Sequence, residues 1–353
     1  MLEKIKENNV WENLKNTNLP VIIYGMGNGA EKIIKILNDF EIEWNDIFAS
    51  DEFVRGHSFL GKKVLKYSEI CEKYEDFIVV MAFASERDDV LERVDCIRKK
   101  HTVVAPDIAV AGNGLFTKEY IKKNEELFDK SYELLADEKS KSDFVDILNF
   151  KVSGKVEYLY NCFTDKNDIY KDILDLNNNE TIIDLGAYNG DTIREICAYT
   201  DGKYDCIHAF EPDKKNFKKL VKNTENMQGV HLYNLGAWDK KDTLIFSQDS
   251  SRNSHISANG ISVEVTDIDS VINSRVSLLK MDIEGSELKA LNGAKHIIKT
   301  YMPKLYVCAY HRNEDMFSLP LKIDSIGNSN YKIYFRHTKY IPAWESNFYC
   351  IPK

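Results

Sequence analysis

The sequence lacks the features of a disulfide-stapled, secreted or membrane-spanning protein. Its seven cysteines include no Cys-x-x-Cys pair and are odd in number, which argues against a disulfide framework or a zinc site and favours thiols in a reducing cytosol. No apolar run approaches the roughly 20 residues of a membrane span, and residues 1–7 have mixed charge without the apolar core of a secretory signal. We therefore expect a cytoplasmic protein with no membrane partner.

The chain has fewer positively than negatively charged residues. The chain has 353 residues, with 47 Lys and Arg against 56 Asp and Glu and a formal net charge of −9. Binding along a phosphate backbone requires a clustered positive surface, so we expect no nucleic-acid partner. The lysines in residues 214–222 are expected to form a solvated helix face.

One local pattern, an apolar strand followed by a glycine turn and a helix, occurs twice. The first copy has a strand at residues 21–24, a turn at 25–30 and a helix at 31–40, and the second has a strand at 181–185. Strands that alternate with helices indicate parallel α/β units. Because the copies lie far apart, we predict two Rossmann-like, doubly wound domains, at residues 1–112 and 113–353, the second with a helical extension at 113–178.

The first glycine turn has the spacing of a dinucleotide-binding motif. Gly25, Gly27 and Ala30 fit G-x-G-x-x-G/A, and Asp51 ends the next apolar run, where an acid can bind a ribose hydroxyl. Together with Gly29 these residues define a candidate second nucleotide site. The alternative is that the glycines only allow a tight turn. This half resembles the small Rossmann-like domains of sugar-modifying enzymes.

The second glycine turn offers a better fit to an adenosyl ligand. Asp184-x-Gly186-x-x-x-Gly190 follows a strand, and Glu211 ends the next strand, where its carboxylate can accept both hydroxyls of a ribose. The bulky pair Tyr188-Asn189 fills the turn in which a dinucleotide site holds a pyrophosphate. The negative charge near this turn attracts a sulfonium or an amino group and repels phosphates.

A third motif lies at the end of another apolar strand. Residues 278–281 precede Asp282-Ile283-Glu284-Gly285-Ser286-Glu287. With Asp-Leu-Gly-Ala-x-x-Gly-Asp-Thr and Phe-Glu-Pro upstream, this order of motifs resembles the FkbM family of S-adenosylmethionine-dependent methyltransferases, from about Leu115 to the C-terminus. The resemblance implies a class I methyltransferase fold, a seven-stranded sheet with an antiparallel terminal hairpin, for which residues 331–336 and 347–351 are candidate strands.

The resemblance also implies S-adenosylmethionine as the cofactor and assigns its contacts. Asp184 would contact the methionine part, Glu211 the ribose and Asn234 the adenine, although the bulk of nearby Trp238 leaves the adenine position open. The residues implied around the cofactor come from the glycine turn and from the ends of the following strands: Asp184, Gly186, Ala187, Tyr188, Asn189, Gly190, Asp191, Thr192, Glu211, Asn234, Gly236, Ala237 and Asp282.

Two residues are the candidates for catalysis. Asp282 would face the transferring methyl group, and His311, after another apolar strand, is a candidate general base; its alternative is a structural role at the strand end. Asp282, Glu284 and His311 include metal-ligand types, but no recognisable ligand spacing, and we expect no metal. Tyr170 either closes over the site or is a core aromatic, and His337 and Arg336 of the final hairpin either contact an acceptor or form a surface pair.

We therefore expect an S-adenosylmethionine-dependent O-methyltransferase that acts on a sugar, a glycan precursor or another small hydroxylated metabolite. The sugar preference comes from the resemblance alone. One alternative is an NAD- or nucleotide-sugar-dependent enzyme acting through the first domain, although no Tyr-x-x-x-Lys pair follows its turn. A non-catalytic scaffold is a third reading, against which the intact second motif set argues. The sequence leaves the oligomeric state open.

Overall fold

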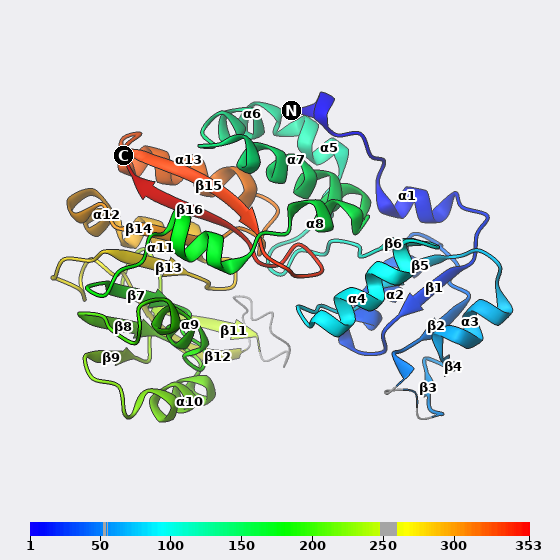
Figure 1. The fold of residues 1–353 in the computed structure, drawn as a ribbon, viewed down its shortest axis with the longest axis horizontal. Coiled ribbons are helices and arrows are strands. Elements are labelled where there is room, and N and C mark those ends of the chain that lie inside the picture. The colour runs from blue at the N-terminus through cyan, green and yellow to red at the C-terminus, as the bar shows by residue number, and fades with distance from the viewer. Residues whose placement is uncertain (52–53, 55, 248–259) are drawn as a thin grey trace.

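The computed structural model describes residues 1–51, 54, 56–247 and 260–353. Two large α/β sheets lie side by side, and a group of helices from the middle of the chain covers one side of the second sheet (Figure 1). The predicted fold class, two doubly wound α/β units, is confirmed. Within the described residues, no helix is both long and apolar enough to cross a membrane.

The first sheet is parallel except at one edge. Its strand order is β3-β4-β2-β1-β5-β6, and only β3 runs antiparallel to its neighbour. Apolar side chains fill β1 and β5 completely, as expected for central parallel strands covered on both faces. Its elements are β1 (Val21–Tyr24), α2 (Asn28–Asp39), β2 (Asp46–Phe48), β3 (Ser58–Phe59), β4 (Lys62–Leu65), α3 (Tyr67–Lys73), β5 (Ile78–Met81), α4 (Asp88–Arg98) and β6 (Thr102–Val104).

Helices join the two sheets. The longest, α7, is capped at its start by the carboxylate of Asp137 and ended by Gly154 in the left-handed conformation (φ +67°), as is usual for helix ends. It packs on β15, and α6 packs on α13 of the second sheet. The N-terminal and connecting elements are η1 (Leu2–Lys4), α1 (Val10–Lys15), α5 (Lys118–Lys123), α6 (Glu125–Glu133), α7 (Glu138–Ser153), α8 (Glu157–Cys162) and η3 (Asp168–Ile173).

The second sheet has the predicted seven strands, in the order β15-β16-β14-β13-β7-β8-β9. Strands β14 to β9 in this order are parallel, and β16 pairs antiparallel with both β14 and β15, so the predicted terminal hairpin is confirmed. Its elements are β7 (Thr181–Leu185), α9 (Asp191–Tyr199), β8 (Cys206–Phe210), α10 (Lys214–Thr224), β9 (Val230–Tyr233), β13 (Leu278–Met281), α11 (Glu287–Gly293), α12 (Lys295–Tyr301), β14 (Lys304–Cys308), α13 (Asp315–Gly327), β15 (Tyr331–His337) and β16 (Ser346–Pro352).

A small three-stranded sheet was not predicted. It has the order β10-β12-β11 and consists of β10 (Gly236–Ala237), β11 (Asp242–Ser247) and β12 (Gly260–Thr266). It follows β9 and therefore borders the end of the second sheet where the motif residues gather.

The segment after β6 connects the first sheet to the motif edge of the second. Asp107 forms an ion pair with Lys151 of α7 at 2.7 Å, and both side chains are buried. Further along, the backbone N–H of Ala111 donates to the carbonyl of His311 at 2.8 Å. The chain between the two sheets thus packs directly behind a predicted catalytic residue. The predicted domain boundary near residue 112 stays a prediction.

Candidate active site

The motif residues converge at the carboxyl ends of β7, β8, β13 and β14, where ligands bind in open α/β sheets. The parallel register of β7 and β13 places Asp184 beside Lys280. The Lys280 ammonium lies 3.1 Å from Asp184 Oδ1, and both side chains are buried. Burial alone would lower the pKa of Lys280, but the carboxylate of Asp184 outweighs it and raises that pKa. Lys280 is therefore a buried cation.

Asp184 is fully buried at this edge of the sheet. Its side chain has no accessible surface; Oδ1 lies 3.1 Å from the Lys280 ammonium, and Oδ2 has no hydrogen-bond partner within the described residues. Lys280 balances the charge from the side of Oδ1. A buried carboxylate oxygen without a donor costs free energy, so this position is suited to an amino group brought by a ligand.

The glycine turn between β7 and α9 passes very close to β13. A Cβ on Gly186 would overlap the backbone carbonyl oxygen of Asp282, and Gly186 has a φ of +81°, so only glycine fits. Tyr188, two residues later, is 42% exposed with a φ of +47°. The turn therefore presents its backbone to the edge and its one large side chain to solvent.

Glu211 closes the other side of the turn. Its two carboxylate oxygens accept the backbone N–H groups of Tyr188 and Asp213, each at 2.8 Å. Burial raises its pKa to about 7, against these two hydrogen bonds, which lower it. The carboxylate is thus fixed in place and keeps lone pairs for two further donors, which suits a ribose.

The predicted adenine residues lie next to Glu211. The side-chain amide of Asn234 donates to the backbone carbonyls of Glu211 and Pro212, at 2.8 and 3.1 Å. Gly236 and Ala237 form β10 and are buried. Trp238 lies under the ammonium of Lys289, 5.4 Å from the ring centroid.

The rest of the turn is held by local hydrogen bonds. The carbonyl of Asn189 accepts the side chains of Arg194 and Asn223, at 3.2 and 2.8 Å. Asp191 accepts the backbone N–H of Thr192 at 2.9 Å. Ala187 is fully buried, and Gly190 has a φ of +83°. The structure thus brings all the predicted cofactor residues to one edge of the sheet.

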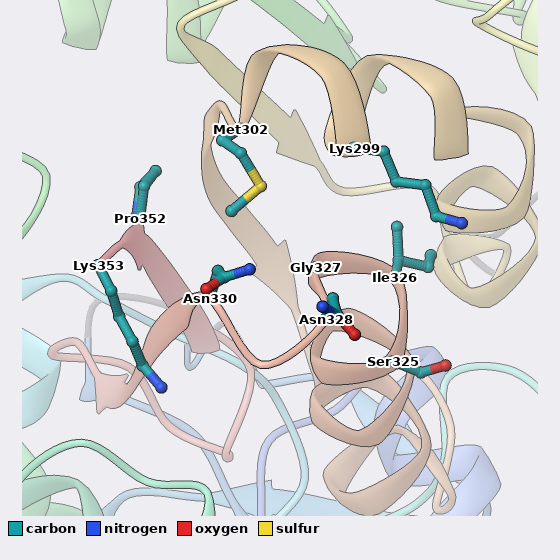
Figure 2. A pocket seen from close by; sticks show the side chains of 9 residues that line it. All are labelled: Lys299, Met302, Ser325, Ile326, Gly327, Asn328, Asn330, Pro352 and Lys353. Carbon is teal, nitrogen blue, oxygen red and sulfur yellow. The ribbon is translucent and has the colours of Figure 1, made fainter.

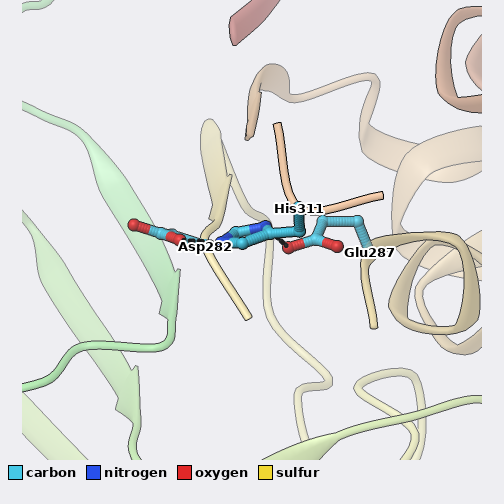
Figure 3. A group of neighbouring side chains, drawn as sticks. All are labelled: Asp282, Glu287 and His311. Atoms are coloured by element: carbon cyan, nitrogen blue, oxygen red, sulfur yellow. Dashed lines mark ion pairs between the residues drawn. The ribbon is translucent and has the colours of Figure 1, made fainter. Parts of the chain in front are cut away.

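Asp282, His311 and Glu287 lie in a row with the imidazole in the middle (Figure 3). His311 Nε2 is 3.3 Å from Asp282 Oδ1, and Nδ1 is 2.9 Å from Glu287 Oε1. Glu287 begins α11 and also accepts the backbone N–H of Ile283 at 3.0 Å. Burial alone would lower the pKa of His311, but the two carboxylates raise it well above 6.5. His311 is therefore an imidazolium at neutral pH.

This row does not suit a single metal ion. The three residues are a cluster of metal-ligand types, but the imidazole separates the two carboxylates, so an ion bound at Nε2 would meet Asp282 while Glu287 lay behind the ring (Figure 3). Glu284, the ligand considered from the sequence, has Oε2 3.8 Å from Nε2 and is about half-exposed. The geometry favours charge pairing over metal binding.

Sequence reasoning assigned no role to Lys280, Glu287 or Asp315. Asp315 is buried behind His311, and burial together with the charge of Glu287 raises its pKa. Glu287 ends the third motif and was visible there, whereas Lys280 and Asp315 become site residues only through strand alternation and helix packing.

The sequence left the roles of Tyr170 and His337 undecided, and the structure buries both side chains. Tyr170 is 3% exposed and stacks on Tyr199 with ring centroids 4.5 Å apart. His337 is fully buried between Ser346 Oγ and the carbonyl of Tyr340, at 3.1 and 3.0 Å, and burial lowers its pKa to about 3. The predicted basic helix face of α10 is exposed, as expected.

The first glycine turn is explained by packing. A Cβ on Gly25 would meet the ring of Phe83, and one on Gly29 would overlap the carbonyl oxygen of Ala82. Both glycines therefore allow helix α2 and its turn to lie against the end of β5. Gly27 has open space, and Asp51 is exposed.

A pocket of about 610 Å³ lies at the opposite end of the second sheet (Figure 2). It is bordered by the ends of α12 and α13 and by Pro352 and Lys353. Since Pro352 pairs with Tyr331 at the far end of the hairpin, this pocket is separate from the edge that carries Asp282.

Comparisons with known proteins agree with this geometry. A model of the methyltransferase FkbM domain matches residues 184–333. The methyltransferase FkbM from Methylobacillus flagellatus KT has the same fold, with a TM-score of 0.71 and 24% identity over 98% of this chain and 93% of that one. No curated protein matches the chain.

More distant structures cover about half of the chain. An rRNA methylase from Streptococcus thermophilus has a TM-score of 0.36 and 11% identity, over 52% of this chain and 94% of that one. Fibrillarin from Aeropyrum pernix, solved with S-adenosyl-L-methionine, has a TM-score of 0.32 and 10% identity, over 50% of this chain and 67% of that one. The family model assigns a methyltransferase FkbM domain to residues 184–333, the family that the motifs of this stretch resemble.

Proposed function

We propose that the protein transfers a methyl group from S-adenosylmethionine to a hydroxyl group of a sugar, a glycan precursor or another small hydroxylated metabolite. The observation that carries the proposal is the pair of buried carboxylates on neighbouring strands, Asp184 and Glu211, with the glycine turn at Gly186 between them. Asp184 suits the amino group of S-adenosylmethionine, and Glu211 suits its ribose hydroxyls.

The residues present fit the cofactor. Asp184 Oδ2 lacks a donor and would hold the methionine amino group, while Glu211 would hold the ribose hydroxyls and the turn at Gly186 would lie against the ligand. When bound, S-adenosylmethionine supplies the methyl group on its positively charged sulfur. Because in-line transfer needs the two reactants aligned, positioning by these groups is expected to supply much of the rate.

Asp282 is the half-buried carboxylate at the centre of the edge. Two cations and a phenol hold it ionised: despite burial, His311, Lys280 and Tyr310 lower its pKa well below the usual range. We propose that Asp282 faces the sulfonium and that His311 keeps it oriented. His311, protonated and placed between two carboxylates, is then a positioning residue rather than the base predicted from the sequence.

The charge of the edge bears on the acceptor. Asp282, Glu284 and Glu287 surround one imidazolium, and such a field repels anionic acceptors. We therefore propose a neutral hydroxylated acceptor such as an uncharged sugar. The first domain then has no assigned ligand, since its turn is explained by packing.

Calorimetric titration with S-adenosylhomocysteine tests this proposal. The wild-type protein is expected to bind it, and Glu211→Ala is expected to bind at least tenfold more weakly. Glu225→Ala, which removes a carboxylate after the end of α10, is the control and should bind as the wild type does. Binding of NADH without binding of S-adenosylhomocysteine would overturn the proposal.

A further inference from the structure

Glu345 lies opposite Tyr310 at the edge that carries Asp282. Strands β14 and β16 pair Cys308 with Asn347, and the backbone N–H of Ala309 donates to the carbonyl of Ser346 at 3.0 Å. Continuing this antiparallel register puts Glu345 across from Tyr310. The Tyr310 hydroxyl in turn donates to Asp282 Oδ1 at 3.2 Å.

These side chains share one face of the sheet. Strand alternation puts Lys280, Cys308 and Asn347 on one face. Glu345 interacts electrostatically with side chains of that face, those of Tyr306, Cys308 and Tyr349. His311 follows Tyr310 in the chain and lies with Glu287.

The backbone holds Glu345 in an uncommon conformation. Its φ is +67°, a region that residues other than glycine occupy only when their surroundings hold them there. Its carbonyl accepts the backbone N–H of Thr338 at 3.2 Å, and the hydroxyl of the next residue, Ser346, donates to the carbonyl of Ala343 at 2.7 Å. The Glu345 side chain is therefore carried by a fixed corner at the start of β16.

The side-chain amide oxygen of Asn347, beside Glu345, lacks a hydrogen-bond partner within the described residues. Asn347 has no accessible surface; its amide N–H donates to the hydroxyl of Tyr349 at 3.3 Å, while Oδ1 has no hydrogen-bond partner within the described residues. A buried amide oxygen left without a donor is costly. A hydroxyl group of a bound acceptor would satisfy it.

The charges around Glu345 leave it a carboxyl group that can change protonation state near neutral pH. Burial and the charge of Asp282 raise its pKa to about 7, against Lys166 and Lys280, which lower it. The other titratable groups that face it stay uncharged because burial raises their pKa values: Tyr170, Tyr306, Tyr310, Tyr349 and Cys308. A general base works best with a pKa near the working pH.

We propose that Glu345 faces the transferable methyl group from the acceptor side and takes the proton of the acceptor hydroxyl. In this step the acceptor oxygen forms a bond to the methyl carbon, and the carbon–sulfur bond breaks with its electron pair moving to sulfur. The hydroxyl proton passes to the Glu345 carboxylate. The inference rests on the proposed function and adds the base that the protonated His311 does not supply.

The test compares the affinities of S-adenosylmethionine and S-adenosylhomocysteine, which differ by the charged methylsulfonium, and needs no acceptor. A carboxylate near the sulfonium favours the charged ligand. At pH 8, Glu345→Gln is expected to lower the ratio of the two affinities about fivefold while the affinity for S-adenosylhomocysteine changes less than twofold. Glu345→Gly is a second variant, which removes the carboxylate and suits the positive φ.

A matched control is Glu195→Gln. Glu195 is half-buried and pairs with the same Lys166, at 3.0 Å, but projects from α9. This variant should keep the wild-type ratio. In the wild type the ratio should also fall between pH 8 and pH 6 as Glu345 takes up a proton, and in Glu345→Gln it should not. Glu211 also has a pKa of about 7, but it is assigned to the ribose, which both ligands share. Its titration therefore changes both affinities equally and leaves their ratio unchanged.

An unchanged ratio in both Glu345 variants would overturn the inference. An equal loss of affinity for both ligands would also overturn it, because it would show a structural role only. Failure of the wild-type protein to bind S-adenosylhomocysteine at all would instead contradict the proposed function.

Discussion

Gly186 lies so close to Asp282 that a single added carbon would overlap the carbonyl oxygen of Asp282. This contact fixes the cofactor turn against the strand that carries the proposed methyl-facing carboxylate. The two sequence motifs, almost 100 residues apart, are thereby one structural unit.

Gly186→Ala is expected to displace the turn and weaken S-adenosylhomocysteine binding at least 100-fold, because both the overlap and the φ of +81° oppose a side chain. Gly202→Ala is the control, since Gly202 has a φ of +72° but open space around its Cβ position. Gly202→Ala introduces only the backbone strain of a side chain at positive φ, without an overlap, and should bind S-adenosylhomocysteine as the wild type does. Equal binding by the two variants would show that the contact has no role.

Binding of S-adenosylhomocysteine should depend on pH through Glu211. The ribose needs an ionised carboxylate, and the pKa of Glu211 is raised to about 7, so the affinity should fall up to about tenfold from pH 8 to pH 6. Glu211→Gln should bind weakly and without this dependence. A wild-type affinity that is flat across this range would contradict the assignment of Glu211 to the ribose.

Replacement of His311 by Asn should destabilise the protein by about 3 kcal/mol, because it leaves the buried carboxylate of Glu287 without its cation. The pKa of His311 is raised in the folded state, so its contribution is complete below pH 6.5 and is lost as the pH rises through the folded-state value. Urea unfolding at pH 6 and at pH 9 measures this. His296→Asn, at an exposed position of α12, should cost less than about 0.5 kcal/mol.

The strands were the most predictable part of the fold. Residues 21–24 and 181–185 are β-strands with the predicted bounds, because each is a short apolar run directly before a glycine turn. Helix α2, by contrast, begins at Asn28 and not near Glu31. Its first turn includes Gly29, which packs on Ala82, and this contact between distant residues has no local signal.

The cofactor edge was predictable from spacing, whereas the charge state of its residues was not. Asp184 lies near the end of its strand, and Glu211 and Asp282 follow theirs, and the carboxyl ends of these strands must meet. The protonation of His311 depends on Glu287 and Asp282 reaching it from other elements. Glu345 belongs to no motif, and only the register of β16 against β14 reveals it.

The ion pair between Asp107 and Lys151 ties the first sheet to the helices of the second half. Lys151→Met should destabilise the protein by about 3 kcal/mol, because it leaves a buried carboxylate unpaired. The double replacement Asp107→Leu with Lys151→Met should recover most of that loss. If the double variant is as unstable as the single one in urea unfolding, the pair acts through shape and not charge.

The packing of the first glycine turn predicts that Gly27→Ala is tolerated. Gly27 has a φ of −156° and open space at its Cβ position, so stability should change by less than about 0.5 kcal/mol. Gly29→Ala, which would overlap Ala82, should be clearly destabilising. NADH titration of both variants and the wild type gives the contrast: tight wild-type binding that Gly27→Ala abolishes would favour the dinucleotide alternative.

A crystal structure of the protein with S-adenosylhomocysteine tests the central claim most directly. We expect the amino group at Asp184, the ribose hydroxyls at Glu211 and the sulfur between Asp282 and Glu345. Ligand bound at the turn of Gly25–Gly29, or with its ribose away from Glu211, would contradict it.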